Sequence, residues 1–172
     1  NPEDVPKAAY LLEHVRDHPG RHASALGREL DLATGQLQYH LRRLRREDRV
    51  VADDRYGRTH YFPPGYDERE REWIALARRE TARAILAALL SGETPAADLA
   101  DRLGIARSTL SYHVDRLREA GLVDERRDEC GRVHLSPSDP ETVESLLATV
   151  DPDASDRLVD RFTRLVDELL DG

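Results

Sequence analysis

Two stretches of the chain resemble each other closely enough to be copies of one structural unit. Residues 23–50 and 96–123 align without a gap at an offset of 73 positions, and 11 of the 28 aligned positions carry the same amino acid. After a shift of one residue the similarity resumes, with GRTHYFPP over 57–64 matching GRVHLSPS over 131–138. Chance similarity between two amphipathic helices would not extend into such a tail. The pattern therefore predicts a duplicated unit.

Each copy carries the pattern of a helix, a tight turn, a second helix and a β-hairpin. In the second copy, Leu99 and Leu103 lie one turn apart on a short helix, and Gly104 suits the left-handed residue that ends it. Asp31 occupies the matching position of the first copy, and aspartate tolerates that conformation. The core side of the second helix follows at helical spacing, with Leu37, Leu41 and Leu44 in the first copy and Leu110, Val114 and Leu117 in the second. The hairpins are VVADD–RYG–RTHYF and LVDERR–DECG–RVHLSP. Two helices joined by a short turn form a helix-turn-helix, and the added hairpin makes it winged.

Further helices are expected around the two copies. A helix over residues 4–17 precedes the first copy and stops at Pro19-Gly20. One long helix is expected from about Asp67 to Leu90, and another begins near Pro140. A sharply amphipathic helix over about 153–170 ends the chain.

The predicted fold class is mainly α with small β-hairpin wings. It consists of two tandem winged helix-turn-helix domains plus C-terminal helices. The expected divisions are a first winged-helix domain at 1–64, a connecting helix at 65–90 that is also the first helix of the second domain, a second winged helix-turn-helix at 91–137, and C-terminal helices with a possible dimerisation role at 138–172.

The two copies also resemble known families. IARSTLSYHVDRLREA followed by GLVDERRDECGRVHLSP resembles the ArsR- and MarR-like winged-helix regulators of archaea and bacteria. HPGRHASALGRELDLATGQLQYHLRRL resembles the first domain of tandem winged-helix proteins common in haloarchaea. The resemblance covers roughly residues 5–137 and is more specific for the fold than for a target. It implies a cytoplasmic transcription regulator that binds double-stranded DNA and dimerises through terminal helices.

The charge profile bears on both the source and the function. Charged residues make up 35% of the chain, the formal net charge is −8, and Lys7 is the only lysine. This composition resembles proteins of a halophilic archaeon, and a GC-rich genome is the alternative reason for arginine in place of lysine. Net acidity opposes DNA binding, because phosphate contacts need cations. However, residues 138–172 hold 10 of the acids and only 3 arginines, and charges are screened beyond about 3 Å in about 1 M salt.

The second helix of the first copy is the stronger candidate for DNA contact. The face opposite its apolar side enters the major groove in a helix-turn-helix, with the N-terminal residues nearest the bases. Gln36 and Gln38 could contact adenine, and the arginines suit phosphate or guanine. The candidate residues are Thr34, Gly35, Gln36, Gln38, Tyr39, Arg42, Arg43 and Arg46, with Arg55 and Arg58 near the hairpin tip. The alternative is a solvated polar face, which five arginines within 42–49 disfavour.

The second copy differs at positions that matter for DNA. Asp115 stands where the first copy has Arg42, and Glu119 stands where it has Arg46. Plausible contacts remain at Arg107, Ser108, Thr109, Ser111, Tyr112 and Arg116, and at Arg126, Arg127 and Arg132 in the hairpin. The alternative is a winged helix kept for dimerisation or for a protein partner.

The last predicted helix carries an apolar stripe that needs a cover. Its members are Leu158, Val159, Phe162, Leu165, Val166 and Leu169. Dimerisation is the favoured interpretation, and packing within the domain is the alternative. The expected partners are therefore duplex DNA and a second copy of the chain, with a possible protein partner through the second domain.

No catalytic or metal chemistry is predicted. The chain has no glycine-rich phosphate loop, no nucleophile elbow and no paired acid–base site, so we expect neither an enzyme nor a cofactor. His14, His18 and His22 are four residues apart, but Pro19-Gly20 interrupts the helix that would align them, so no metal site is expected. His40, His113, His60 and His134 occupy matched positions of the repeat, and a structural role is expected for them.

The remaining sequence features concern the compartment. Cys130 is the only cysteine, so no intrachain disulfide can form, and a redox switch at this thiol competes with an incidental role. No apolar run approaches the 18 or so residues that span a membrane, so no membrane segment is expected in this chain. The first residue is Asn1 rather than Met, which leaves open whether a segment precedes it.

Three functions are compatible with these sequence features. The leading one is a sequence-specific DNA-binding transcription regulator whose first copy makes the stronger contacts. The alternative is a tandem winged-helix protein-interaction module, as in chromosome-condensation complexes or RNA-polymerase accessory factors. A one-component sensor that encloses a small ligand is the third, and no ligand chemistry in the sequence supports it.

Overall fold

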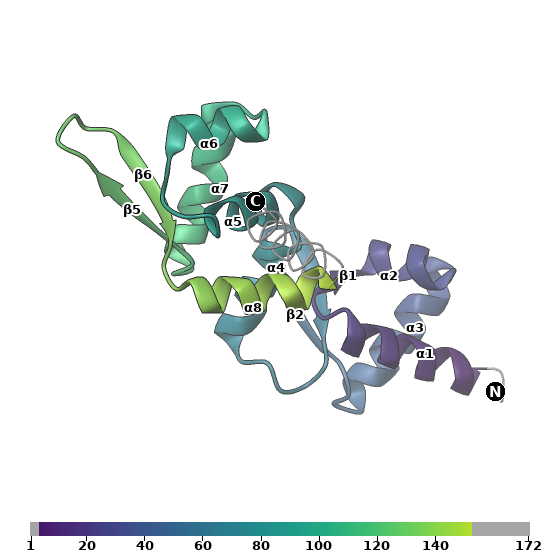
Figure 1. Ribbon diagram of the computed structural model, residues 1–172. Helices are drawn as coiled ribbons and strands as arrows, with labels where there is room; N and C mark the ends of the chain where they lie inside the picture. Colours follow the sequence, from purple (N-terminus) through teal and green to yellow (C-terminus); the bar gives the residue numbers. More distant parts are fainter. Residues whose placement is uncertain (1–3, 153–172) are drawn as a thin grey trace, which may run out of the picture. The chain divides into compact units, whose positions relative to one another are not determined.

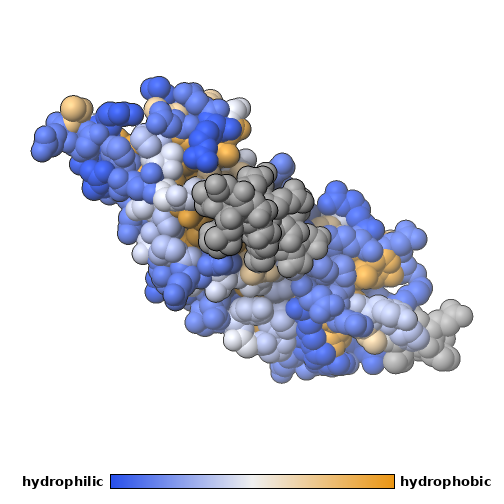
Figure 2. Space-filling view, in the orientation of Figure 1, coloured by the Kyte–Doolittle hydropathy of each residue, from blue (hydrophilic) through white to orange (hydrophobic). Residues whose placement is uncertain are grey.

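A computed structural model describes residues 4–152 and divides the chain into two compact units (Figure 1). The N-terminal unit is Asn1–Arg78 and the C-terminal unit is Arg79–Gly172. The surface visible in Figure 2 is mostly hydrophilic where residues are described. Within the described part, no helix has the length and apolarity needed to cross a membrane. The predicted helix over 153–170 and its apolar stripe lie outside the described residues.

The N-terminal unit is a helix-turn-helix with a three-stranded antiparallel sheet. Its elements are α1 (Asp4–Asp17), β1 (Arg21–His22), α2 (Ala23–Leu30), α3 (Thr34–Arg46), β2 (Val51–Arg55), β3 (Arg58–Phe62) and α4 (Glu68–Ala77). The strand order is β1-β3-β2. Tyr56 and Gly57 both have positive φ angles (52° and 79°) and connect β2 to β3 as a two-residue turn. The predicted hairpin is confirmed, and β1 is an additional strand too short to show an alternating pattern.

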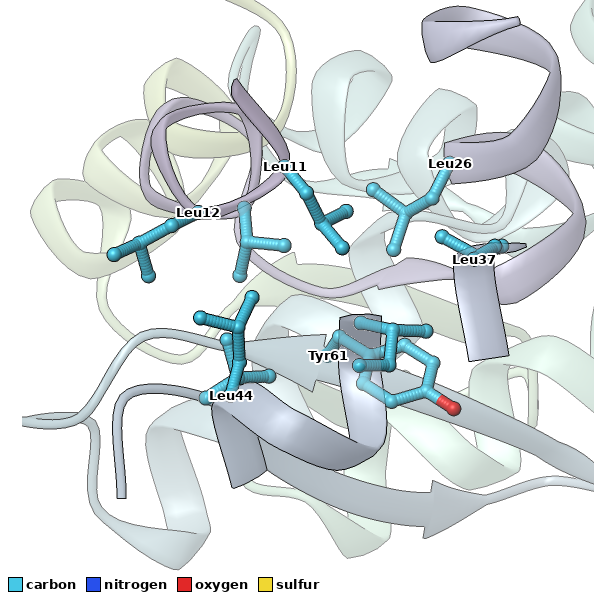
Figure 3. Close-up of a cluster of buried hydrophobic side chains, with 9 residues drawn as sticks. Leu11, Leu12, Leu26, Leu37, Leu44 and Tyr61 are labelled. Atoms are coloured by element: carbon cyan, nitrogen blue, oxygen red, sulfur yellow. The ribbon is translucent and has the colours of Figure 1, made fainter. Parts of the chain in front are cut away.

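The turn between α2 and α3 has the predicted geometry. Asp31 ends α2 in the left-handed conformation, with φ 52° and ψ 48°. Ala33 precedes α3 and gives it no side-chain cap. The core beneath the turn consists of Leu11, Leu12, Val15, Leu26, Leu37, Leu41, Leu44, Val50 and Tyr61 (Figure 3). These side chains come from α1, α2, α3, β3 and the loop before β2. Their burial fixes the orientation of α3 in the N-terminal unit.

The predicted single helix from Asp67 to Leu90 is wrong. α4 ends at Ala77, and α5 begins at Glu80. Arg79 between them is extended, with φ −76° and ψ 128°. The guanidinium of Arg78 donates two hydrogen bonds to the Pro19 carbonyl at 2.7 and 3.0 Å, which anchors this end of α4 in the N-terminal unit. No glycine or proline marks the break in the sequence. The break coincides instead with a contact between residues far apart in the sequence, Arg78 and Pro19.

Gly20 lets α4 approach the sheet. Its φ is +84°, and a Cβ at this position would lie 2.5 Å from Cγ2 of Ile74 and 3.3 Å from the Phe62 ring. Asp67 starts α4 with a capping box, since its carboxylate accepts from the Glu70 N–H and the Glu70 carboxylate accepts from the Asp67 N–H. The α4 helix is thus an integral part of the N-terminal unit.

The C-terminal unit repeats the arrangement, as the duplicated pattern predicts. Its elements are α5 (Glu80–Leu89), β4 (Thr94–Pro95), α6 (Ala96–Leu103), α7 (Arg107–Glu119), β5 (Val123–Arg127), β6 (Val133–Pro137) and α8 (Pro140–Val150). The sheet order is β4-β6-β5. Gly104 ends α6 with φ 65°, and Asp139 caps α8. The expected fold class, mainly helical with two small winged sheets, is confirmed.

Candidate nucleic-acid interface

The outer face of α3 presents a group of arginines around an exposed tyrosine. Leu37, His40, Leu41 and Leu44 are buried on the inner side of α3. The opposite side forms an open groove of about 550 Å³ lined by Tyr39, Arg42, Arg45 and Arg46. The sequence prediction included three of these four residues and missed Arg45. Its identity with Arg118 in the repeat was the available signal.

Most of these arginines have no acidic partner. Arg42 Nε donates to the Gln38 carbonyl at 3.3 Å, and Arg43 pairs with Glu47 at 3.0 Å. Within residues 4–152, the structure shows no ion pair for Arg42, Arg45 or Arg46. The charge of these three side chains is therefore available to an external anion.

A second hollow lies beside α3 and is lined by residues of four elements, β1, α2, α3 and β3. It measures about 480 Å³ and is lined by His22, Ala23, Ser24, Arg28, Gln38, Arg58, Thr59 and Tyr61. It brings the predicted Gln38 and Arg58 together with Ser24, Arg28 and Thr59, which sequence reasoning missed. The N-terminus of α2 opens onto this hollow, and free backbone N–H groups at such an end favour anions.

The acceptor that caps α2 is a histidine. His22 Nδ1 accepts a hydrogen bond from the Ala25 N–H at 3.3 Å, so this nitrogen is unprotonated. Burial lowers the pKa of His22 below its usual value, and the positive charges of Arg58 and Arg28 lower it further. The surroundings of His22 are therefore cationic.

Arg55 lies at the predicted position but is already engaged. Its side chain is 22% exposed and pairs with Asp53 at 2.9 Å and with Glu68 of α4 at 3.2 Å. Asp53 also accepts from Arg71 Nε at 2.8 Å, and the Tyr56 hydroxyl donates to Glu72. Burial alone would raise the pKa of Asp53, but the hydrogen bonds from Arg71 and Arg55 outweigh it and lower the pKa. Arg55 therefore links the β2–β3 hairpin to α4 through ion pairs.

The corresponding helix of the C-terminal unit, α7, has a different outer face. Arg107, Ser108, Thr109, Ser111 and Tyr112 are exposed there, as are Asp115 and Glu119. The Arg116 guanidinium lies over the Tyr112 ring at 4.3 Å. Arg118 pairs with Glu125 at 3.1 Å, whereas Ala52 occupies the position of Glu125 in the first copy.

The second wing is held by its own polar contacts. Arg126 pairs with Glu93, and Arg127 donates to the Gly131 carbonyl at 3.3 Å. The Asp128 carboxylate accepts from the N–H groups of Cys130 and Arg132 at 2.9 Å, and it also contacts the His134 ring. The hydrogen bond with His134 is the main cause of a lowered pKa at Asp128. Cys130 is exposed in this loop.

The histidines occupy structural positions. His40 and His60 are buried, and the His60 ring lies 2.7 Å from the Gly20 carbonyl oxygen. His14 contacts Glu29, and its ring centroid lies 4.5 Å from that of His18 with the two rings tilted by 44°. The described residues contain no group of three or more side chains arranged to hold a metal ion.

Comparisons with known proteins agree with this architecture. A family model described as an N-terminal HTH domain matches residues 8–74, and one described as a helix-turn-helix domain matches residues 76–126. An uncharacterised HTH-type transcriptional regulator of Methanocaldococcus jannaschii is 25% identical over 118 residues. That match covers 69% of this chain but only 30% of the relative's own length.

Two solved structures are also similar to part of the chain. NolR from Sinorhizobium fredii is 26% identical with a TM-score of 0.46, covering 51% of this chain and 86% of NolR. A homodimeric winged helix-turn-helix DNA-binding domain from Mycobacterium bovis, a possible ArsR-family regulator, is 26% identical with a TM-score of 0.43, covering 55% of this chain and 93% of that domain. By its two family matches and its two winged units, the chain carries two helix-turn-helix domains in tandem.

Proposed function

We propose that this chain is a transcription regulator that binds specific sequences of duplex DNA, with α3 as its principal DNA-contacting helix. The observation that carries the proposal is the outer face of α3, where Arg42, Arg45 and Arg46 are exposed and have no ion pair within the described residues. Helix-turn-helix proteins place such a face in the major groove. The similarity to the HTH-type transcriptional regulator of Methanocaldococcus jannaschii supports the same function.

The geometry suggests how the contacts are divided. Thr34, Gly35 and Gln36 are exposed at the N-terminus of α3, where side chains reach base edges. The arginines further along α3 suit phosphates or guanine. Ser24, Arg28, Arg58 and Thr59 line the adjacent hollow, which suits a backbone phosphate. In this arrangement Gln38 lies at the boundary between the two surfaces.

Replacing α3 arginines tests the proposal. Each lost phosphate contact reduces the slope of log affinity against log salt by about 0.9, so R42A/R46A should flatten it by up to about 2 and weaken binding most at low salt. Arg16→Ala is the matched control, because Arg16 is exposed on α1, away from the groove. If R42A/R46A binds DNA as the wild type does at matched salt, α3 is not the principal contact.

Sequence specificity needs its own measurement. Selection of bound duplexes from a random pool should return one motif, and Gln36→Ala should relax it at particular positions because glutamine can pair with adenine. If the selected duplexes share no motif, the chain binds DNA without sequence specificity, and that part of the proposal is wrong.

The outer face of α7 in the C-terminal unit combines groups that favour DNA with groups that oppose it. Its exposed Arg107, Thr109 and Ser111 give α7 some capacity for DNA, but Asp115 and Glu119 oppose phosphates. The two acids favour the second candidate function, a protein-interaction module. An R107A/R132A variant that keeps wild-type DNA affinity would support this alternative for the C-terminal unit.

A homodimer is proposed from the sequence stripe over residues 158–169. Burial of that stripe between two chains would hold them together through the hydrophobic effect. Phe162→Asp should therefore convert a dimer to a monomer in sedimentation experiments, with unchanged helix content in the described units. A chain that is monomeric before the substitution would refute the dimer.

A further inference from the structure

The helix-turn-helix surfaces of the two units carry opposite charges at matched positions. Arg28, Arg42 and Arg46 of the N-terminal unit align with Asp101, Asp115 and Glu119 of the C-terminal unit, and all six side chains are exposed. The two folds place these positions equivalently, since both have the same order of elements and the same turn geometry. The C-terminal unit therefore presents an acidic version of the surface that is basic in the N-terminal unit.

The acidic face of α7, which we define as Tyr112, Asp115 and Glu119, lies beside two arginines that do not pair with its carboxylates within residues 4–152. Arg118 is paired with Glu125, and Arg116 lies over the Tyr112 ring. In residues 4–152 no ion pair involves Asp115 or Glu119. Both carboxylates are therefore available to an external cation.

We propose that the acidic face of α7 binds the basic face of α3, formed by Tyr39, Arg42, Arg45 and Arg46, in a second copy of this chain. The carboxylates of Asp115 and Glu119 are four residues apart, as are Arg42 and Arg46. Each pair therefore spans about 6 Å along its helix axis. Each face also has a half-exposed tyrosine, at 50% for Tyr39 and 48% for Tyr112. The two faces therefore match in the opposite signs and equal spacing of their charges, whereas the Tyr112 ring is covered by Arg116.

The proposed contact joins two unlike faces of the same chain. Such a heterologous contact can close into a ring or extend from chain to chain. The contact occupies the arginines of α3, and it masks them when DNA is absent. This masking of DNA binding rests on the proposed function, whereas the association itself does not.

Salt dependence separates this contact from an apolar dimer. Exposed charges interact over about 10 Å in 0.1 M salt and over about 3 Å in 1 M salt. The α3–α7 contact is therefore lost in concentrated salt. An association through the apolar C-terminal segment persists there, because burial of apolar surface does not depend on charge.

Charge exchange between the two faces tests the contact. Self-association of the full chain is measured by sedimentation equilibrium in 0.1 M and 1 M KCl for R42E/R46E, for D115R/E119R and for the chain with all four substitutions. Each pair should weaken the salt-sensitive association at least about tenfold, because it sets like charges against each other. The four-site variant should regain it. E129R/E144R is the matched control, since Glu129 and Glu144 are exposed outside the α7 face, and circular dichroism checks the fold of every variant.

Several outcomes overturn the proposal. The proposal fails if the four-site variant associates as weakly as the two double variants, or if the control loses as much association as D115R/E119R. It also fails if neither R42E/R46E nor D115R/E119R changes the association. Masking of DNA binding that does not depend on protein concentration would arise within one chain and would overturn the proposal too. A basic peptide that binds α7 while no second copy does so also overturns it.

A DNA arm distinguishes this inference from the proposed function. D115N/E119Q should raise DNA affinity in 0.1 M salt more than E129Q/E144Q does, because it unmasks α3 without adding a cation. In 1 M salt the two variants should have the same DNA affinity. Charge-exchange behaviour without any DNA binding would leave the contact in place and refute the proposed function. DNA binding through α3 with no response to charge exchange would refute only the contact.

Discussion

Replacing Gly20 with alanine should destabilise the N-terminal unit through two separable effects. The φ of +84° is unfavourable for an L-residue with a side chain, which costs about 1–2 kcal/mol. The added Cβ would also lie 2.5 Å from Cγ2 of Ile74, too close for a carbon–carbon contact. Ile74 is buried in α4, so it can move only by displacing the packing around it, at about 1–3 kcal/mol. The expected total is about 2–5 kcal/mol.

The assay follows the only tryptophan of the chain, Trp73, which lies in α4. Its fluorescence during urea denaturation reports on the N-terminal unit even if the two units unfold separately. With a denaturant dependence of about 1–3 kcal/mol per molar urea, the midpoint should fall by at least about 0.7 M.

Gly57→Ala is the matched control for this experiment. Gly57 has a similar φ of +79° at the wing tip, but nothing lies within 4 Å of a Cβ there. It should therefore show only the conformational cost of about 1–2 kcal/mol. If Gly20→Ala costs no more than Gly57→Ala, the close approach of α4 to the sheet is refuted.

Three further predictions concern the same unit. Asp53→Asn should cost about 1–3 kcal/mol at pH 7, because charged hydrogen bonds to Arg55 and Arg71 are lost. The folded-state pKa of Asp53 lies below the unfolded value of 3.8, so this stability is present above pH 3.8 and is lost as the pH falls through the folded-state pKa. In urea titrations, the difference in unfolding free energy between the variant and the wild type should therefore disappear at acidic pH. The pKa of His22 is also lowered, from 6.5, so its contribution to stability is present above pH 6.5 and disappears as the pH falls through the folded-state pKa. His22→Ser replaces the capping ring nitrogen with a hydroxyl acceptor that does not titrate, and it should weaken the acid sensitivity of the Trp73 midpoint between pH 7.5 and 5. An unchanged pH profile would contradict this expectation. Gly35→Ala should stabilise α3 by about 1 kcal/mol, since the position is helical and open, and a lower midpoint would argue against this local geometry.

Features encoded by neighbouring residues could be predicted without the structure. The repeat and its apolar spacing predicted both helix-turn-helix units, because residues three and four apart share one face of a helix. The left-handed residues Asp31 and Gly104 were predicted for the same reason, since only a few residue types tolerate that conformation. The outer positions of Arg42 and Arg46 follow from the position of the buried leucines of α3, whereas Arg45 was missed.

Features that depend on distant contacts could not be predicted in this way. Arg55 was predicted as a DNA contact, and the sequence did not indicate the ion pairs that the structure gives it with Asp53 and Glu68. Arg28 gave no signal until the fold placed it beside Arg58 in one hollow. The break after Ala77 coincides with hydrogen bonds from Arg78 to Pro19, which are 59 positions apart. Periodicity records only which face of a helix is buried, whereas the partner of a long charged side chain depends on which segments the fold brings together. The sequence by itself therefore determined the duplicated winged architecture and the opposite charges of α3 and α7, and the tertiary structure alone decided which arginines remain available for a ligand.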